Sequence, residues 1–158
     1  MRQYTRFVTL LLPLLLVLPA MSAESQIIGV IKTVKGDASV IRGQQTIPAA
    51  IGTKLYLNDT LQTSPEGNLG LILRDDSILS MGPNSRVILD QFLFAPREGK
   101  LGFLIKIMRG TVAYLSGVIV KLSPSTAKFD TPVATIGIRG THFAVKVQGN
   151  DVQARSNP

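Results

Sequence analysis

Short apolar runs separated by turn-forming residues are the feature of this sequence that most restricts its fold. From Ile27 onward, β-branched and aromatic residues recur in such runs, and Gly, Pro, Asn or Asp ends most of them. This pattern is typical of β-strands. No stretch beyond the N-terminal leader sustains a helical apolar period over two turns. The sequence therefore predicts an all-β domain of many short strands, either solenoid-like or an irregular sandwich.

Two segments give the clearest strand predictions. Leu69–Leu73 and Ile78–Met81 are separated by Arg74-Asp75-Asp76-Ser77, so we expect a hairpin. Lys100–Met108 is the longest run, and its apolar residues alternate as in a strand with one buried face. We expect Arg109-Gly110 to turn the chain at the end of this run.

The last third of the chain is predicted to continue in the same way. Val112–Leu115 and Val118–Leu122 are expected to pair as strands around Ser116-Gly117. The residues from 149 to 158 are polar and end in Pro, so we expect a disordered tail.

The N-terminus has the layout of a secretory signal peptide at residues 1–23. Arg2 and Arg6 supply positive charge, Phe7–Leu18 is apolar, and small residues allow cleavage after Ala20 or Ala23. The apolar stretch is shorter than the roughly 20 residues that a membrane-spanning helix needs. No Cys follows it, so the sequence offers no bacterial lipid-anchor site. We therefore expect a signal-peptide helix and an exported mature protein, periplasmic or secreted, with no membrane insertion after cleavage.

Composition limits the classes of partner. The chain carries 17 Lys and Arg against 10 Asp and Glu, and without Arg2 and Arg6 the net charge is +5. The basic residues are scattered singly, and the sequence has no Trp and only three Tyr, so neither a nucleic-acid tail nor a base-stacking platform is indicated. There is no Cys, so an exported domain must be held by its core alone. The length suits one core, and we expect a single domain over residues 24–148.

The sequence offers little for catalysis or metal binding. His142 is the only histidine, and neither a Cys nor a G-x-S-x-G motif is present. Asp75-Asp76 is the only adjacent carboxylate pair, and it falls in a predicted turn, where Asp is favoured for geometric reasons. We expect no catalytic residue, no metal and no cofactor. A hydrolase that uses His142 with a carboxylate is kept as an alternative.

The run Thr131–Phe143 is the most distinctive in the chain. Pro132 opens it, and Gly137 and Gly140 bracket Arg139 between apolar residues, which predicts two short strands joined by a sharp corner. If Arg139 is buried there, it must be paired with a carboxylate or with backbone carbonyls. If it is exposed, it is available to a partner's carboxylate. The candidate carboxylate partners within the chain are Asp59 and Asp130.

These residues resemble the periplasmic domain of the FecR family over roughly residues 28–147. The segment Thr131–Thr141 is similar to the family signature T-P-x-A-x-x-G-x-R-G-T. The positions that carry the signature are Thr131, Pro132, Gly137, Arg139, Gly140 and Thr141.

Two upstream segments add to the resemblance. The stretch that runs from Gly52 through Asp59 to Thr63 is similar to the family's G-x-x-L-x-x-x-D-x-L-x-T. Asp75-Asp76-Ser77 falls where the family pattern has Asp-Gly-Ser, so Asp76 is a departure.

The resemblance implies an all-β, solenoid-like periplasmic domain that senses or relays by binding protein. Full-length FecR regulators also carry a cytoplasmic anti-sigma region and a membrane helix, and they meet the signalling domain of an outer-membrane transporter. This chain has a predicted signal peptide in their place, and its family-like pattern ends after Val147, as in a truncated chain.

We therefore expect a non-enzymatic, exported FecR-domain protein that acts as a protein-binding sensory or signalling module. Its expected partner is another envelope protein. The alternative is a carbohydrate- or cell-wall-binding β module, although the absence of Trp weakens it, because sugar faces usually stack on aromatic rings.

Overall fold

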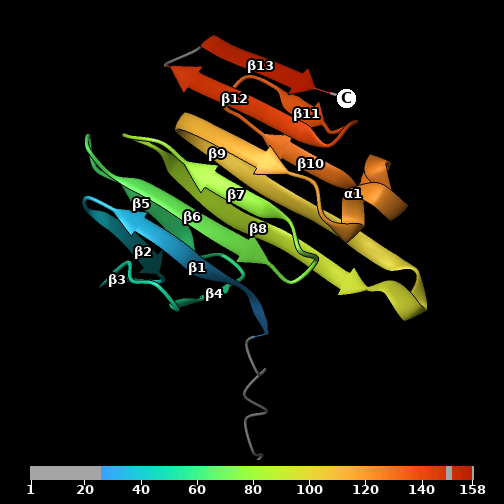
Figure 1. The fold of residues 1–158 in the computed structure, drawn as a ribbon, viewed down its shortest axis with the longest axis horizontal. Coiled ribbons are helices and arrows are strands. Elements are labelled where there is room, and N and C mark those ends of the chain that lie inside the picture. The colour runs from blue at the N-terminus through green and yellow to red at the C-terminus, as the bar shows by residue number, and fades with distance from the viewer. Residues whose placement is uncertain (1–25, 149–150, 158) are drawn as a thin grey trace, which may run out of the picture.

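The computed structural model describes residues 26–148 and 151–157, which form an all-β domain (Figure 1). The predicted signal peptide at residues 1–23 lies outside these residues, as do residues 149, 150 and 158 of the predicted tail. The strands are β1 (Ile27–Lys35), β2 (Ala38–Arg42), β3 (Gln45–Pro48), β4 (Lys54–Tyr56), β5 (Thr60–Thr63), β6 (Asn68–Leu73), β7 (Ile78–Met81), β8 (Arg86–Ala95), β9 (Lys100–Leu115), β10 (Ala127–Asp130), β11 (Thr135–Gly137), β12 (His142–Gln148) and β13 (Asp151–Asn157). The helical segments are η1 (Pro96–Glu98), α1 (Val118–Leu122) and η2 (Pro124–Thr126).

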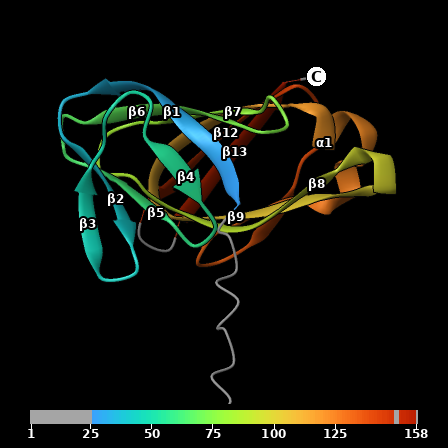
Figure 2. The same ribbon diagram turned by 90° about the horizontal axis from the view of Figure 1, so that it is seen from below.

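Strand β9 joins the two layers of the fold. Its first part pairs with β8 and, in parallel, with β10, whereas its last part pairs with β7 and β12. One layer therefore runs β3-β2-β5-β8-β9-β10-β11, and the other runs β4-β1-β6-β7-β9-β12-β13. Figure 2 shows β6 and β7 lying over β5 and β8. The whole is one curled sheet in which the chain passes repeatedly between layers. The predicted all-β class is confirmed.

A bend inside β9 carries the chain from one layer to the other. Phe103, Ile105 and Ile107 are buried, but beyond the bend the buried positions become Val112 and Tyr114, so the alternation changes parity. The register with β8 shifts at this point, as in a β-bulge. Gly110 has φ +93°, a conformation that favours glycine. The predicted turn at Arg109-Gly110 is therefore wrong, because the bulge and the glycine bend one continuous strand.

The core lies between the two layers and has an aromatic cluster at one end. Phe103, Tyr114, Phe129 and Phe143 come from β9, β10 and β12, and consecutive ring centroids lie 5.2–5.5 Å apart. All four are at most 5 % exposed. Such contacts add to the stabilisation that burial of the rings supplies.

Val118–Leu122 forms the helix α1, so its predicted pairing as a strand is wrong. Val118 N–H donates to the Asp75 carbonyl at 2.7 Å, and Ile119 N–H donates to the Asp75 carboxylate at 3.3 Å. Ile119 and Val120 are buried. Tertiary contacts thus override the strand preference of the β-branched residues. No helix in the part of the chain that the structure describes is long and apolar enough to cross a membrane.

Asp151–Asn157 forms β13, which corrects the predicted disordered tail for these residues. The strand pairs antiparallel with β12 along its whole length, from Gln148↔Asp151 to His142↔Asn157. Its polar sequence lacks the apolar alternation that identifies a half-buried strand. Backbone pairing to β12 therefore places this strand, and among its described side chains the partly buried Val152 packs against the core.

Candidate functional site

The signature run begins as a tight turn between β10 and β11. Thr131 N–H donates to the Ala134 carbonyl at 2.8 Å, and Ala134 N–H donates to Thr131 Oγ1 at 3.1 Å. Pro132 is exposed within this turn. Thr131 and Pro132 therefore shape the backbone between two strands.

The second half of the run is the corner between β11 and β12. Ile138 is 4 % exposed and faces the core. The Ser116 hydroxyl donates to the Gly140 carbonyl at 2.8 Å, and Ser116 N–H donates to the Thr141 carbonyl at 2.9 Å. Ile138 and Ser116 hold this corner, and sequence reasoning missed the role of both.

Arg139 does not fasten the corner, contrary to the structural interpretation of the sequence. Its side chain is exposed, and no carboxylate of the described residues lies within ion-pair distance of it. Asp130 accepts a hydrogen bond from the Thr135 hydroxyl, and Asp59 binds Arg42. The candidate carboxylates are therefore occupied elsewhere, and the exposed guanidinium fits the alternative interpretation.

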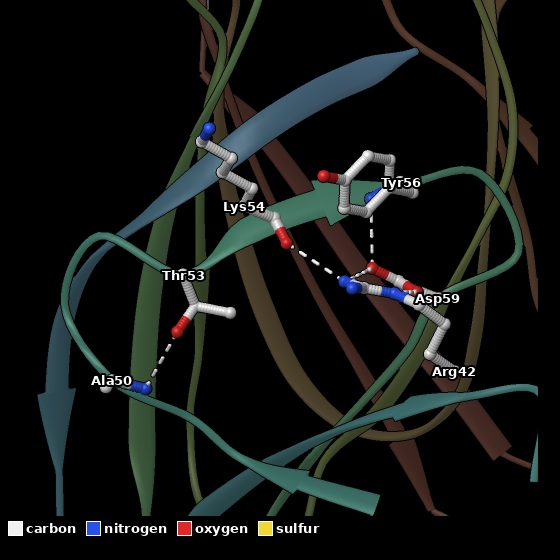
Figure 3. A network of polar contacts seen from close by, with 6 residues as sticks. All are labelled: Arg42, Ala50, Thr53, Lys54, Tyr56 and Asp59. Carbon is white, nitrogen blue, oxygen red and sulfur yellow. Dashed lines mark hydrogen bonds and ion pairs between the residues drawn. The ribbon is translucent and has the colours of Figure 1, made fainter. Parts of the chain in front are cut away.

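Asp59 is fully buried and forms a bidentate pair with Arg42 (Figure 3). Arg42 Nε donates to Oδ1 at 2.8 Å, and a terminal guanidinium nitrogen donates to Oδ2 at 2.7 Å. Tyr56 N–H completes the carboxylate's contacts at 2.9 Å, and the Lys54 carbonyl accepts from Arg42. The hydrogen bond to Asp59 raises the pKa of Arg42.

This network ties β2 to the turn that connects β4 and β5. Arg42 also stacks over the Tyr56 ring, with its central guanidinium carbon 4.4 Å from the ring centroid. The sequence identified Asp59 but not Arg42, because their pairing spans 17 positions and Arg42 precedes a turn glycine. Such a closed network is structural rather than reactive.

A second buried network surrounds Asp75. Its carboxylate accepts hydrogen bonds from Ser77 N–H at 3.2 Å, from the Ser77 hydroxyl at 2.7 Å and from Ile119 N–H. Ser77 Oγ also lies 2.7 Å from the Tyr114 hydroxyl. Burial raises the pKa of Tyr114 well above its ordinary value. Asp75 thus joins the β6–β7 hairpin to the start of α1, and its oxygens face the core.

The backbone conformation at the adjacent Asp76 accounts for the glycine that the family pattern has at this position. It lies in the hairpin turn with φ +63°, the left-handed conformation that favours glycine. Asp tolerates this conformation better than most residues do. Asp75 therefore bonds the hairpin to α1, whereas Asp76 belongs to the hairpin turn. Within residues 26–148 and 151–157, no three His, Cys, Asp or Glu side chains are grouped to hold a metal ion.

His142 begins β12 on the outward face of its layer. Across the described chain, no carboxylate forms an ion pair with it. It lines a hollow of about 400 Å³ whose exposed lining comes from β7, β9, β12 and β13. The outward-facing side chains there are Ile78, Ser80, Ala113, Leu115, His142, Ala144 and Arg155. This face is the candidate binding surface, since the hollow is open to solvent and the buried networks are not.

The comparisons with known proteins place the chain in a family context. A protein-family model described as FecR protein matches residues 59–155. No curated protein and no solved structure matches. The matched segment begins at the buried Asp59 and ends in β13, so it includes the signature run and the candidate binding surface.

Proposed function

Since this chain belongs to the FecR protein family, we propose that it is an exported, non-enzymatic module that senses or signals by binding another envelope protein. The match over residues 59–155 is the observation that carries the proposal. The matched segment includes β5 to β12 and most of β13, which supply much of the core and the open hollow.

Export is supported by the signal-peptide layout of residues 1–23. Expression with the full leader in a bacterial host should give a periplasmic or secreted protein. N-terminal sequencing should find it cleaved after Ala20 or Ala23. A protein that keeps its leader and stays in the membrane fraction would contradict export.

A non-enzymatic role is supported by the use of the polar groups. The buried carboxylates of Asp59 and Asp75 are engaged by structural partners, and the only histidine lacks a carboxylate partner among the described residues. If a hydrolase activity is found, the variant His142→Ala tests the competing mechanism. Activity that disappears with His142 would favour an enzyme, whereas full activity would remove that mechanism.

Protein binding is tested by a pull-down from envelope extract with the mature chain, over a series of salt concentrations. We expect a specific envelope protein to be retained at physiological salt. Capture of no envelope protein at any salt would overturn the proposal. Co-sedimentation with purified peptidoglycan tests the carbohydrate-binding alternative, which has little structural support because Tyr114 is buried and Arg42 covers Tyr56.

A further inference from the structure

We infer that the outward face of β7, β9, β12 and β13 docks an extended segment of the partner protein that carries acidic and apolar side chains. This inference rests on the proposed function. It adds the binding surface and the chemistry of the bound segment, which the proposed function does not specify. Two features of the face carry it: its shape and its charge.

The shape follows from the strand register. Ser80, Ala113, Ala144 and Arg155 are aligned across the four strands, and the first three have small side chains. We call this row the small-residue trough. All four residues are exposed.

Larger side chains border the trough on both sides. One border is the row Ile78, Leu115 and His142, and the other is Thr111, Lys146 and Gln153. The result is two adjoining hollows of about 400 and 310 Å³ that share Ala144 and Arg155. A groove of this form suits a narrow extended chain better than a flat surface.

The charge around the trough has one sign. Arg155 ends the row, and Lys146 stands on one border. Among the residues whose side chains the structure describes, neither set of lining residues includes Asp or Glu. Because complementary charge selects and orients a partner, carboxylates on the bound segment are expected opposite Arg155 and Lys146. The apolar floor suits small apolar side chains between those carboxylates.

Other occupants fit this face less well. A second copy docked symmetrically would bring the same cations together, since a two-fold interface is self-complementary. A lipid surface is bound by large apolar side chains that project into it, whereas the row along this trough is made of Ser80, Ala113 and Ala144 before it ends at Arg155. Single-stranded nucleic acid needs exposed aromatic rings for stacking, and Tyr114 and Phe143 are buried beneath this face.

The test is a selection of short random peptides, displayed on phage, against the purified full chain after leader removal. We expect the enriched peptides to combine Asp or Glu with small apolar residues. Binding of the best synthetic peptide, measured by fluorescence anisotropy, should weaken about tenfold or more in Arg155→Glu. It should also weaken in Ala113→Gln, which fills the trough without changing charge.

Matched control substitutions test whether a loss of binding is specific to this surface or follows from any change of charge or size. Arg97→Glu makes the same charge change at an exposed residue of η1, and Ala50→Gln makes the same size change in an exposed loop. Both should bind as the unsubstituted chain does. Unchanged melting temperatures confirm that all four variants fold. If Arg155→Glu or Ala113→Gln does not fold, Lys146→Glu replaces it.

Several outcomes would overturn the inference. These are a selection that enriches no peptide or only peptides without carboxylates, binding that survives both trough substitutions, and equal losses in the controls. Phosphatidylglycerol vesicles that bind the unsubstituted chain but not Arg155→Glu would assign the face to lipid.

The envelope pull-down distinguishes a wrong assignment of the docking surface from a failure of the proposed protein-binding function. If Arg155→Glu retains the same envelope protein as the unsubstituted chain, the protein-binding function stands and the surface is wrong. If the unsubstituted chain retains none at any salt, the function itself is wrong.

Discussion

At the scale of single residues, Arg42 and Arg139 have opposite roles in this domain. Arg42 binds the buried Asp59 through two hydrogen bonds, although its own side chain is 37 % exposed. Arg139 belongs to the family-like signature, yet it lies in solvent. A charged residue in a motif is therefore structural only when the fold supplies its partner.

Replacing Arg139 with Ala should change the free energy of unfolding by no more than about 0.5 kcal/mol, because exposed side chains without fixed contacts contribute little. Thermal melting of the purified domain measures this. A loss of several kcal/mol would instead show that Arg139 pairs inside the fold.

Replacing Arg42 with Ala should destabilise the domain by about 2–4 kcal/mol, since it leaves a fully buried carboxylate with one backbone donor. Denaturant unfolding measures the loss. Arg42→Lys should recover part of it, because a lysine keeps the charge but not the bidentate geometry. An Arg42→Ala variant as stable as the unsubstituted chain would contradict the structural role of this pair.

Replacing Asp75 with Ala should cost about 3 kcal/mol or more, because it leaves the donors of Ser77 and Ile119 without their acceptor in the core. Asp76→Gly is the neighbouring control and should be neutral or slightly stabilising, since glycine accepts φ +63° without strain. Denaturant unfolding of the two variants should therefore give shifts that differ by at least the cost of Asp75→Ala.

At the scale of elements, β9 shows how one glycine and one bulge turn a strand into a link between layers. A Cβ on Gly110 would overlap the Ser85 side chain and backbone. Ser85 is itself fixed there, because its hydroxyl donates to the Thr111 carbonyl and accepts from Thr111 N–H. The bend therefore leaves no room for any larger residue.

Replacing Gly110 with Ala should destabilise by about 2–4 kcal/mol, because the substitution adds backbone strain to a steric overlap. Gly43→Ala is the matched control: φ is +58°, but nothing lies within 4 Å of an added Cβ. It should cost only about 1 kcal/mol. Equal losses in the two variants, measured by chemical denaturation, would mean that the close approach to Ser85 adds nothing.

The sequence predicted those elements whose pattern is local. The hairpin of β6 and β7 and the alternation in the first part of β9 follow from residues close in the chain, and both are confirmed. The helix α1 was not predictable, because its N-terminal contacts come from Asp75, more than 40 positions earlier. Strand β13 was missed because its partner β12, rather than an apolar pattern of its own, gives it order.

The same distinction applies to the candidate site. The signature run could be recognised as a corner, but the contacts that hold it, Ser116 and Ile138, depend on the packing of two strands. The small-residue trough is formed by single residues of four strands, and only the register brings them into one row. No local motif marks such a surface.

At the scale of the whole molecule, β9 is flanked by strands on both sides along much of its length, while β3, β4, β11 and β13 lie at the edges. Hydrogen exchange should therefore be slowest in β9 and fastest in these edge strands, since edges open locally at low cost. Exchange measured by NMR or mass spectrometry checks the ranking. Protection in β13 equal to that in β9 would contradict it.

The central place of β9 also fixes the order in which the domain can fold. Until Lys100–Leu115 has joined, β7 and β8 each have a partner on one side only. A chain that emerges N-terminus first thus holds two open strand edges for most of its length, and such edges pair readily with other chains. Folding must await a late segment and form many long-range pairs, which makes it slow. During its synthesis, this chain therefore depends on being kept apart from its neighbours until its ninth strand arrives.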